Sequence, residues 1–181
     1  YFLKLANDSR ASYLTAGLKK KKDKKTSLGR AKGINYLHGT ETSSWVDEDG
    51  LKALMSSLAE TYENRFYIFE STAQGYDLFY DMWQTAKSPL TLTQKAIFIG
   101  WWRNERYRIP RGDRRFNTYW DGALTKDEEK WIMEIKELYD FDIEVEQVAW
   151  YRWKYEEQMK DPTKGQNMML QEFPHTEDYA F

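Results

Sequence analysis

The sequence contains no cysteine, only four prolines and only two histidines among its 181 residues. Without cysteine there are no disulfide bonds and no thiolate metal sites, which is compatible with a reducing compartment. No apolar run approaches the roughly 18 residues that a membrane-spanning helix requires. The composition therefore predicts a soluble globular protein that does not interact with a membrane.

Aromatic residues make up 17% of the chain and include eight tryptophans. This abundance indicates a large, well-anchored core or aromatic binding faces. Charge is distributed unevenly, since residues 1–33 carry ten Lys and Arg against two acids, leaving 17 against 27 in the remainder. The two parts of the chain are therefore expected to meet different partners or solvents.

The most basic stretch is Lys19–Lys25, with six lysines in seven residues. Like charges at this density repel one another, so we expect a mobile loop. It has two interpretations: contact with nucleic-acid phosphates, or a solvated insertion without a function.

The N-terminal two thirds of the chain predict an α/β fold. A hairpin is expected in residues 1–16, because Asn7-Asp8-Ser9 is turn chemistry between two apolar runs. Strands and helices then alternate, which is typical of a parallel sheet. The expected strands cover residues 34–38, 65–70 and 95–102, and the expected helices cover residues 47–61 and 76–83.

From Arg103 onward the sequence changes character. Residues 103–115 hold six arginines without hydrophobic periodicity, which indicates a linker or extended arm over 103–120. Thr125 and Glu128 have the spacing of a capping box before a helix that includes Trp131 and Tyr139. Further helices are expected over 144–159 and 164–172, so residues 121–181 are interpreted as a small acidic helical subdomain.

Two of the expected strands end in polar residues. The first ends at Gly39-Thr40-Glu41 and the second at Glu70-Ser71. Ligands of open α/β sheets bind at this edge, and a carboxylate there could position a water for phosphoryl transfer. The alternative is that Glu41 is an ordinary acid of a surface loop. Ser71 and Thr72 have no nearby His or Asp in the sequence, so a hydrolase nucleophile is not expected, and the two histidines are interpreted as structural.

Four sequence motifs follow one another along the chain. They are Tyr36-Leu37-His38-Gly39-Thr40-Glu41, then Glu70-Ser71-Thr72-Ala73-Gln74-Gly75 with Phe79-Tyr80, then Phe98-Ile99-Gly100-Trp101-Trp102, and finally residues 148–154 with 171–181. In this order they resemble the large terminase subunit of tailed bacteriophages, the ATPase that packages DNA. The resemblance extends over residues 28–181.

The resemblance implies an additional-strand P-loop NTPase core, a three-layer α/β/α sheet, with a helical lid. Residues 1–102 would be part of the ATPase core and residues 121–181 the lid. In that family an acidic pair ends the Walker B strand, and here Glu41 matches its second, catalytic member. Thr40 stands where the first is commonly Asp, and its hydroxyl could hold a metal-bound water. Ser71, Thr72 and Gly75 would belong to the coupling motif that senses the γ-phosphate of ATP.

The sequence contains no Gly-x-x-x-x-Gly-Lys-Ser/Thr phosphate loop. Because the chain begins at Tyr1 rather than Met, we expect a fragment, a processed product or the ordered part of a longer polypeptide. The resemblance implies a phosphate loop upstream of Tyr1 and a nuclease domain downstream of Phe181. Such a fragment is not expected to hydrolyse ATP alone. The alternative is a non-catalytic nucleic-acid-binding or assembly module, such as a prophage remnant.

For the complete motor, the resemblance implies ATP and Mg²⁺ as cofactors. It implies double-stranded DNA, the portal protein and the small terminase subunit as partners. A homo-oligomeric ring in the bacterial host cytoplasm is the expected assembly.

Overall fold

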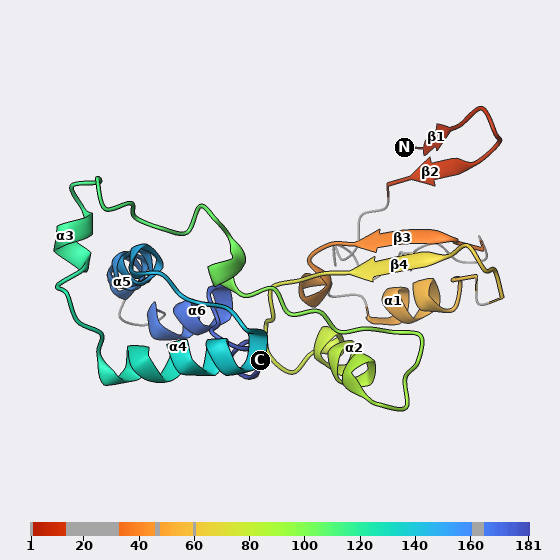
Figure 1. The fold of residues 1–181 in the computed structure, drawn as a ribbon. Coiled ribbons are helices and arrows are strands. Elements are labelled where there is room, and N and C mark those ends of the chain that lie inside the picture. Colours follow the sequence, from red (N-terminus) through yellow and green to blue (C-terminus); the bar gives the residue numbers. More distant parts are fainter. Residues whose placement is uncertain (1, 14–32, 46–47, 60, 161–164) are drawn as a thin grey trace. The chain divides into compact units, whose positions relative to one another are not determined.

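The computed structural model describes residues 2–13, 33–45, 48–59, 61–160 and 165–181 (Figure 1). The chain divides into two compact units, residues 1–71 and 72–181. The fold class is mixed α/β, as predicted from the sequence. No helix in the described parts of the chain has the length and apolar character needed to cross a bilayer.

The first unit begins with the predicted hairpin. Strands β1 (Phe2–Lys4) and β2 (Arg10–Ser12) pair in antiparallel register, with Leu3 opposite Ala11. Asp8 takes the left-handed conformation (φ 63°) in the turn, and the Ser9 amide donates to the Asn7 side chain at 3.2 Å. The turn chemistry read from the sequence is therefore confirmed, whereas the lysine-rich stretch lies outside the described residues.

The two strands that carry the predicted site are β3 (Tyr36–Gly39) and β4 (Phe66–Phe69). They pair in parallel, with Tyr36 opposite Phe66 and Gly39 opposite Phe69, which confirms the predicted neighbours and their direction. Helix α1 (Glu48–Met55) connects them and buries Leu51 and Leu54.

Helix α1 is shorter than the expected helix over residues 47–61. After Met55 the backbone turns to pair with Ile34, whose amide donates to the Ser57 carbonyl and whose carbonyl accepts from the Ala59 amide, both at 3.0 Å. Residues 57–59 thus gain partners next to β3 that a continued helix would not reach. Leu58 forms a parallel bridge with Ile34 instead of lying on the helix face.

The third expected strand, over residues 95–102, is wrong. Residues 94–100 are extended without a strand partner, and Trp101–Arg103 form a short 3-10 helix, η2. Trp101 and Trp102 are buried in the core of the second unit, and the Phe98 ring packs 5.5 Å from that of Tyr139. Phe98, Trp101 and Trp102 therefore pack in the helical unit rather than extending the β3–β4 sheet, while Ile97 and Ile99 are exposed.

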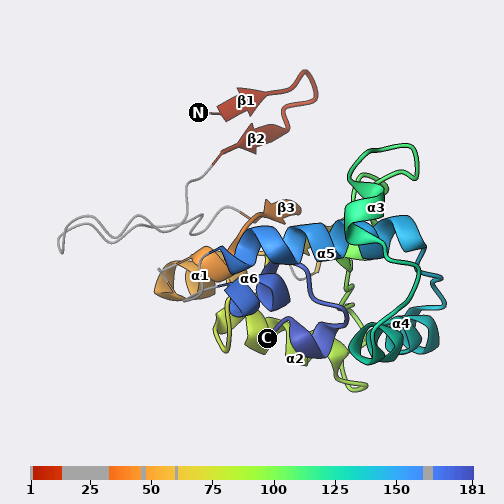
Figure 2. The same ribbon diagram turned by 90° about the vertical axis from the view of Figure 1, so that its left-hand side faces the viewer.

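The second unit is helical. Its helices are α2 (Leu78–Lys87), α3 (Phe116–Tyr119), α4 (Lys126–Tyr139), α5 (Val145–Met159) and α6 (Gly165–Glu172). Helices α3 and α6 pack against α5 (Figure 2). The predicted capping box of α4 is confirmed, because Glu128 donates its amide to Thr125 Oγ1 and accepts the Thr125 amide at 2.7 Å.

An aromatic core holds this unit together. Its rings stack closely, with Trp150 4.4 Å from Tyr107 and 5.4 Å from Trp101. Segment 103–120, expected to be a linker, contributes Ile109 and Phe116 to this core. The buried cluster contains Trp101, Trp102, Ile109, Phe116, Trp131, Ile135, Val148, Ala149 and Trp150.

The residues after α6 close this core. His175 is buried, with its ring stacked 4.5 Å from Trp131, as expected for a structural histidine. Its carbonyl accepts the Trp102 indole N–H at 3.1 Å. Burial lowers the His175 pKa to about 4, so the imidazole is neutral at pH 7. Further along, the Phe181 ring packs 5.1 Å from that of Tyr80 on α2.

A close contact at Gly100 predicts that an alanine at this position lowers the stability of the fold. A Cβ on Gly100 would lie 2.4 Å from the Trp102 indole, which is buried and hydrogen-bonded. Gly100→Ala should therefore force Trp102 to move and lower the free energy of unfolding by about 1–3 kcal/mol. Urea unfolding followed by tryptophan fluorescence measures this. Gly112→Ala is the control, since nothing lies within 4 Å of its added Cβ; equal losses in both variants would contradict the prediction.

Candidate functional site

The carboxyl ends of β3 and β4 are joined by backbone hydrogen bonds. The Glu70 amide donates to the Gly39 carbonyl at 2.9 Å, and the Thr42 amide donates to the Glu70 carbonyl at 3.0 Å. The pairing thus continues past both strands. It places the loop after β3 beside the residues that follow β4, at one edge of the sheet.

Glu41 occupies this loop in an unusual conformation. Its backbone is left-handed, with φ 52° and ψ 44°, and it immediately precedes the 3-10 helix η1 (Thr42–Ser44). Its carbonyl accepts the Ser44 amide at 2.9 Å, while the residue is exposed. A non-glycine residue in this region costs on the order of 1–3 kcal/mol and persists only where its surroundings fix it, often at functional sites.

Thr40 and Trp45 help to fix the loop. The Trp45 indole N–H donates to the Thr40 carbonyl at 2.9 Å, which closes the loop across Glu41. Thr40 itself is exposed, so its hydroxyl and the Glu41 carboxylate belong to the solvent-facing side of the same short loop.

Ser71 lies at the same edge as this loop. Its Oγ accepts the Ser43 amide at 3.1 Å, two residues beyond Glu41. Thr72 and Gly75, by contrast, belong to the second compact unit. There Gly75 has φ +100°, a conformation that favours glycine. The structure thus brings together Thr40, Glu41 and Ser71, and describes Thr72 and Gly75 in a separate unit.

Sequence reasoning missed Thr42, the residue that ties the edge together. Its side chain is buried, and its hydroxyl lies 3.3 Å from the Glu70 carbonyl and 3.4 Å from the Gly39 carbonyl. The strand register could have pointed to Thr42. When Gly39 pairs with Phe69, the loop after Gly39 brings Thr42 next to Glu70. A hydroxyl there can donate a further hydrogen bond to a carbonyl that already accepts a backbone amide.

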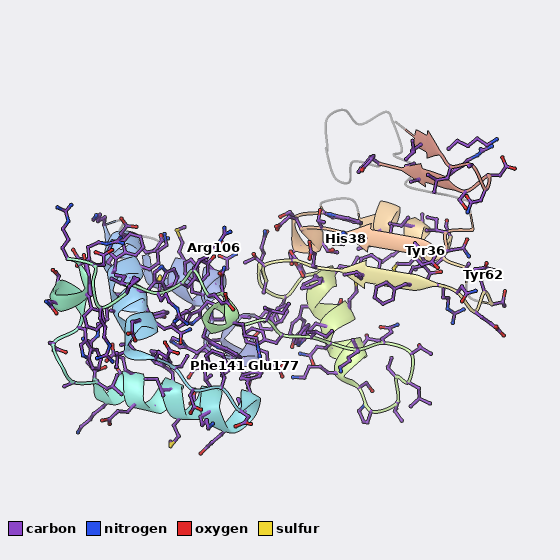
Figure 3. The ribbon with its side chains drawn as sticks, turned by 45° about the horizontal axis from the view of Figure 1, so that its top comes forward. Tyr36, His38, Tyr62, Arg106, Phe141 and Glu177 are labelled. Carbon is purple, nitrogen blue, oxygen red and sulfur yellow. The ribbon has the colours of Figure 1, made fainter. Side chains whose placement is uncertain are left out.

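An exposed His and Glu pair was also missed. His38 Nε2 lies 3.2 Å from Glu70 Oε1 across the two strands, and both side chains are more than half exposed. His38 and Tyr36, two residues apart on β3, point to the same face of the sheet (Figure 3). Unlike His175, His38 therefore has a polar partner at the surface close to the candidate site.

The edge offers the carboxylates of Glu41 and Glu70 and hydroxyl groups rather than a metal cage. In the described parts of the chain, no group of three or more His, Cys, Asp or Glu side chains is placed to hold a metal ion. Mg²⁺ in nucleotide sites is usually held by one or two carboxylates together with phosphate oxygens. Glu41, with the Thr40 hydroxyl beside it, fits such a partial site.

Comparisons with protein-family models, with curated proteins and with solved structures found no match to this chain. The residues at this edge and their geometry are therefore the basis for inferring a function.

Proposed function

We propose that this chain is the second half of the ATPase domain of a DNA-packaging motor, of the large terminase type. One observation carries the proposal: two parallel strands end side by side, and the loop that holds a strained, exposed Glu41 is bonded to Ser71. This is the arrangement that phosphoryl transfer requires of its water-positioning group, a carboxylate fixed at a sheet edge.

In this proposal Glu41 orients and polarises the water that attacks the γ-phosphate. Bound ATP with Mg²⁺ would supply the phosphoryl group. Ser71, Thr72 and Gly75 would contact the nucleotide, and the Thr40 hydroxyl would hold a metal-bound water. The phosphate loop comes from a part of the motor outside this sequence. Strands β3 and β4 would then belong to an additional-strand P-loop sheet, and residues 121–181 would form the lid.

Ser71 is proposed to transmit the state of the site. Its Oγ bonds the Glu41 loop at Ser43, and the next residue begins the second compact unit. A change at Glu41 can therefore reach the start of that unit through one side-chain hydrogen bond. Thr72 and Gly75 follow directly and are proposed to complete the coupling element.

The proposal predicts a specific defect in Ser71→Ala. In a complete motor containing this chain, the variant should lose DNA translocation by about fivefold or more beyond its loss of ATP hydrolysis measured without DNA. The reason is that the alanine removes the link to Ser43 but leaves Glu41 in place. Parallel assays of translocation and of phosphate release measure the two rates.

Ser56→Ala is the matched control, because the Ser56 hydroxyl donates to the Lys52 carbonyl of α1 at 2.9 Å rather than to the Glu41 loop. It should leave both rates unchanged. If Ser71→Ala lowered hydrolysis and translocation equally, Ser71 would have no coupling role.

The alternative function is a non-catalytic nucleic-acid-binding or assembly module. Two sequence features favour it: the chain has no Gly-rich phosphate loop, and it has a lysine-rich stretch. Reading the encoding gene distinguishes the two functions. A phosphate loop within about 150 residues upstream of Tyr1 supports the motor, and a start codon close to Tyr1 supports the module.

A further inference from the structure

Helix α4 carries apolar residues beyond those buried in the aromatic core. Trp131 and Ile135 point into that core. Ile132 is partly buried and packs against it, while Met133 is 57% exposed. An amphipathic surface helix normally shows a polar face outside its core stripe. The surface formed by Ile132 and Met133 therefore requires a separate explanation.

These residues form one wall of a groove of about 470 Å³. The opposite wall consists of Leu124 and of the segment after α4, which includes Phe141 (Figure 3) and Ile143. On the helix, the lining residues follow the spacing of a single stripe, from Glu129 through Ile132, Met133 and Lys136 to Glu137. The stripe spans nine residues and rises about 12 Å from the first to the last, which is slightly more than two helical turns.

The rim of the groove is acidic. Glu129, Glu137 and Asp142 line it, and Asp140 is adjacent. Lys136 is the one cation among the lining residues, and it is held by Asp140 at 3.0 Å and by Asp142 at 2.9 Å. Arg103 approaches the Phe141 ring at 5.7 Å. Four acids against these two cations leave a net charge of −2 around an apolar floor.

We propose that this groove is the docking site for a basic amphipathic helix of a partner protein. The apolar floor fits two or three anchor side chains at positions i, i+3 or i+4, and i+7 of such a helix. The acidic rim complements Lys and Arg on its flanks. A wholly polar segment would leave the apolar floor in contact with water. An acidic segment would be repelled by the acidic rim. The groove uses residues between Leu124 and Ile143 together with Arg103, and none of the candidate site residues Thr40, Glu41 and Ser71.

A synthetic helix provides a direct test on the full 181-residue chain. The probe is a fluorescein-labelled peptide of about 20 residues, long enough to be helical, with Leu at helical spacing and Lys on the flanks. Fluorescence anisotropy measures its Kd. Met133→Lys should weaken binding about tenfold or more, because it removes an anchor contact and adds a positive charge, and tenfold corresponds to about 1.4 kcal/mol.

Leu138→Lys is the matched control. Leu138 is on the same helix and is 61% exposed, but it does not line the groove, and the substitution adds the same charge. It should change the Kd less than twofold. A second variant, with Glu129→Gln and Glu137→Gln together, should weaken binding and flatten its salt dependence without removing apolar contact.

Three outcomes would overturn the proposal. One is equal weakening by Met133→Lys and Leu138→Lys, which would mean that only net charge matters. Another is equal binding of a peptide with the same composition but without helical spacing. The third is self-association of the chain, seen by sedimentation and lost in Met133→Lys, which would assign the groove to a second copy.

Discussion

In a complete motor that contains this chain, Glu41→Gln is expected to lower ATP turnover by about 10²–10⁴-fold while leaving folding and nucleotide binding intact. The amide has nearly the same shape as the carboxylate, so the left-handed loop and the hydrogen bond from the Ser44 amide to the residue 41 carbonyl should persist. The charge that orients and polarises the attacking water is lost. Phosphate release under single-turnover conditions measures the rate, and binding of a fluorescent nucleotide measures affinity.

Glu63→Gln is the control for this experiment, because Glu63 is an exposed acid of the same compact unit away from the strand ends. It should leave turnover within about twofold, as expected for a surface substitution. A Glu41→Gln motor with near-normal turnover would remove Glu41 from the mechanism. The loop would then be an ordinary turn at the end of a strand.

The largest expected effect on stability comes from Arg152. Its guanidinium donates to both carboxylate oxygens of Glu128, each at 2.7 Å, and to Asp121 at 2.9 Å. It also donates to the Tyr119 and Ala123 carbonyls, so one side chain of α5 ties down the chain that leads into α4. Only 19% of the Arg152 side chain and 10% of the Glu128 side chain are exposed.

Arg152→Met is therefore expected to lower the free energy of unfolding by about 3–5 kcal/mol, because it leaves the Glu128 carboxylate buried without its partner. Urea unfolding followed by tryptophan fluorescence measures the loss. Arg111→Met is the control, since that arginine pairs with Glu146 but is 71% exposed, and it should cost about 1 kcal/mol or less. Similar losses in both variants would show that the Arg152 network adds nothing beyond a surface ion pair.

The same network makes stability depend on pH. Burial raises the Glu128 pKa, but hydrogen bonds from Arg152 and Thr125 outweigh burial and hold the pKa below its usual value. A carboxyl with a lowered folded-state pKa stabilises the fold above its unfolded-state pKa, and this contribution is lost as the pH falls through the folded-state value. Arg152→Met should therefore lose less stability than the wild type on acidification in that range.

Local signals predicted local structure well. The capping box at Thr125 and the turn at Asn7-Asp8-Ser9 were correct because hydrogen bonds between near neighbours decide them. The parallel pairing of β3 and β4 was correct because a helix between two apolar runs favours a crossover connection. In each case the residues that decide the structure lie within a few positions or within one supersecondary unit.

The strand expected over 95–102 was wrong, because local sequence patterns do not decide the structure of this segment. A short apolar run fits a buried strand and a segment packed against helices equally well, and periodicity cannot separate them. The position of Trp101 depends on Trp131 and Trp150, and that of Trp102 on Tyr139 and Phe141, all more than 25 residues away. The same limit applies to the candidate site. The sequence predicted that Thr40, Glu41 and Ser71 lie at one edge of the sheet. The left-handed conformation of Glu41 could not be predicted, because it depends on contacts that Thr42 and Trp45 make across the loop.

The double role of Glu128 has a consequence for how the helical unit opens. The first turn of a helix ordinarily frays, so that its amides exchange with solvent without wider unfolding. Here the carboxylate that accepts the Thr125 amide also holds Arg152 in the middle of α5. The start of α4 cannot fray without breaking that ion pair. We therefore expect opening of this helix end to be coupled to opening of the core, so that α4 and α5 exchange as one cooperative unit.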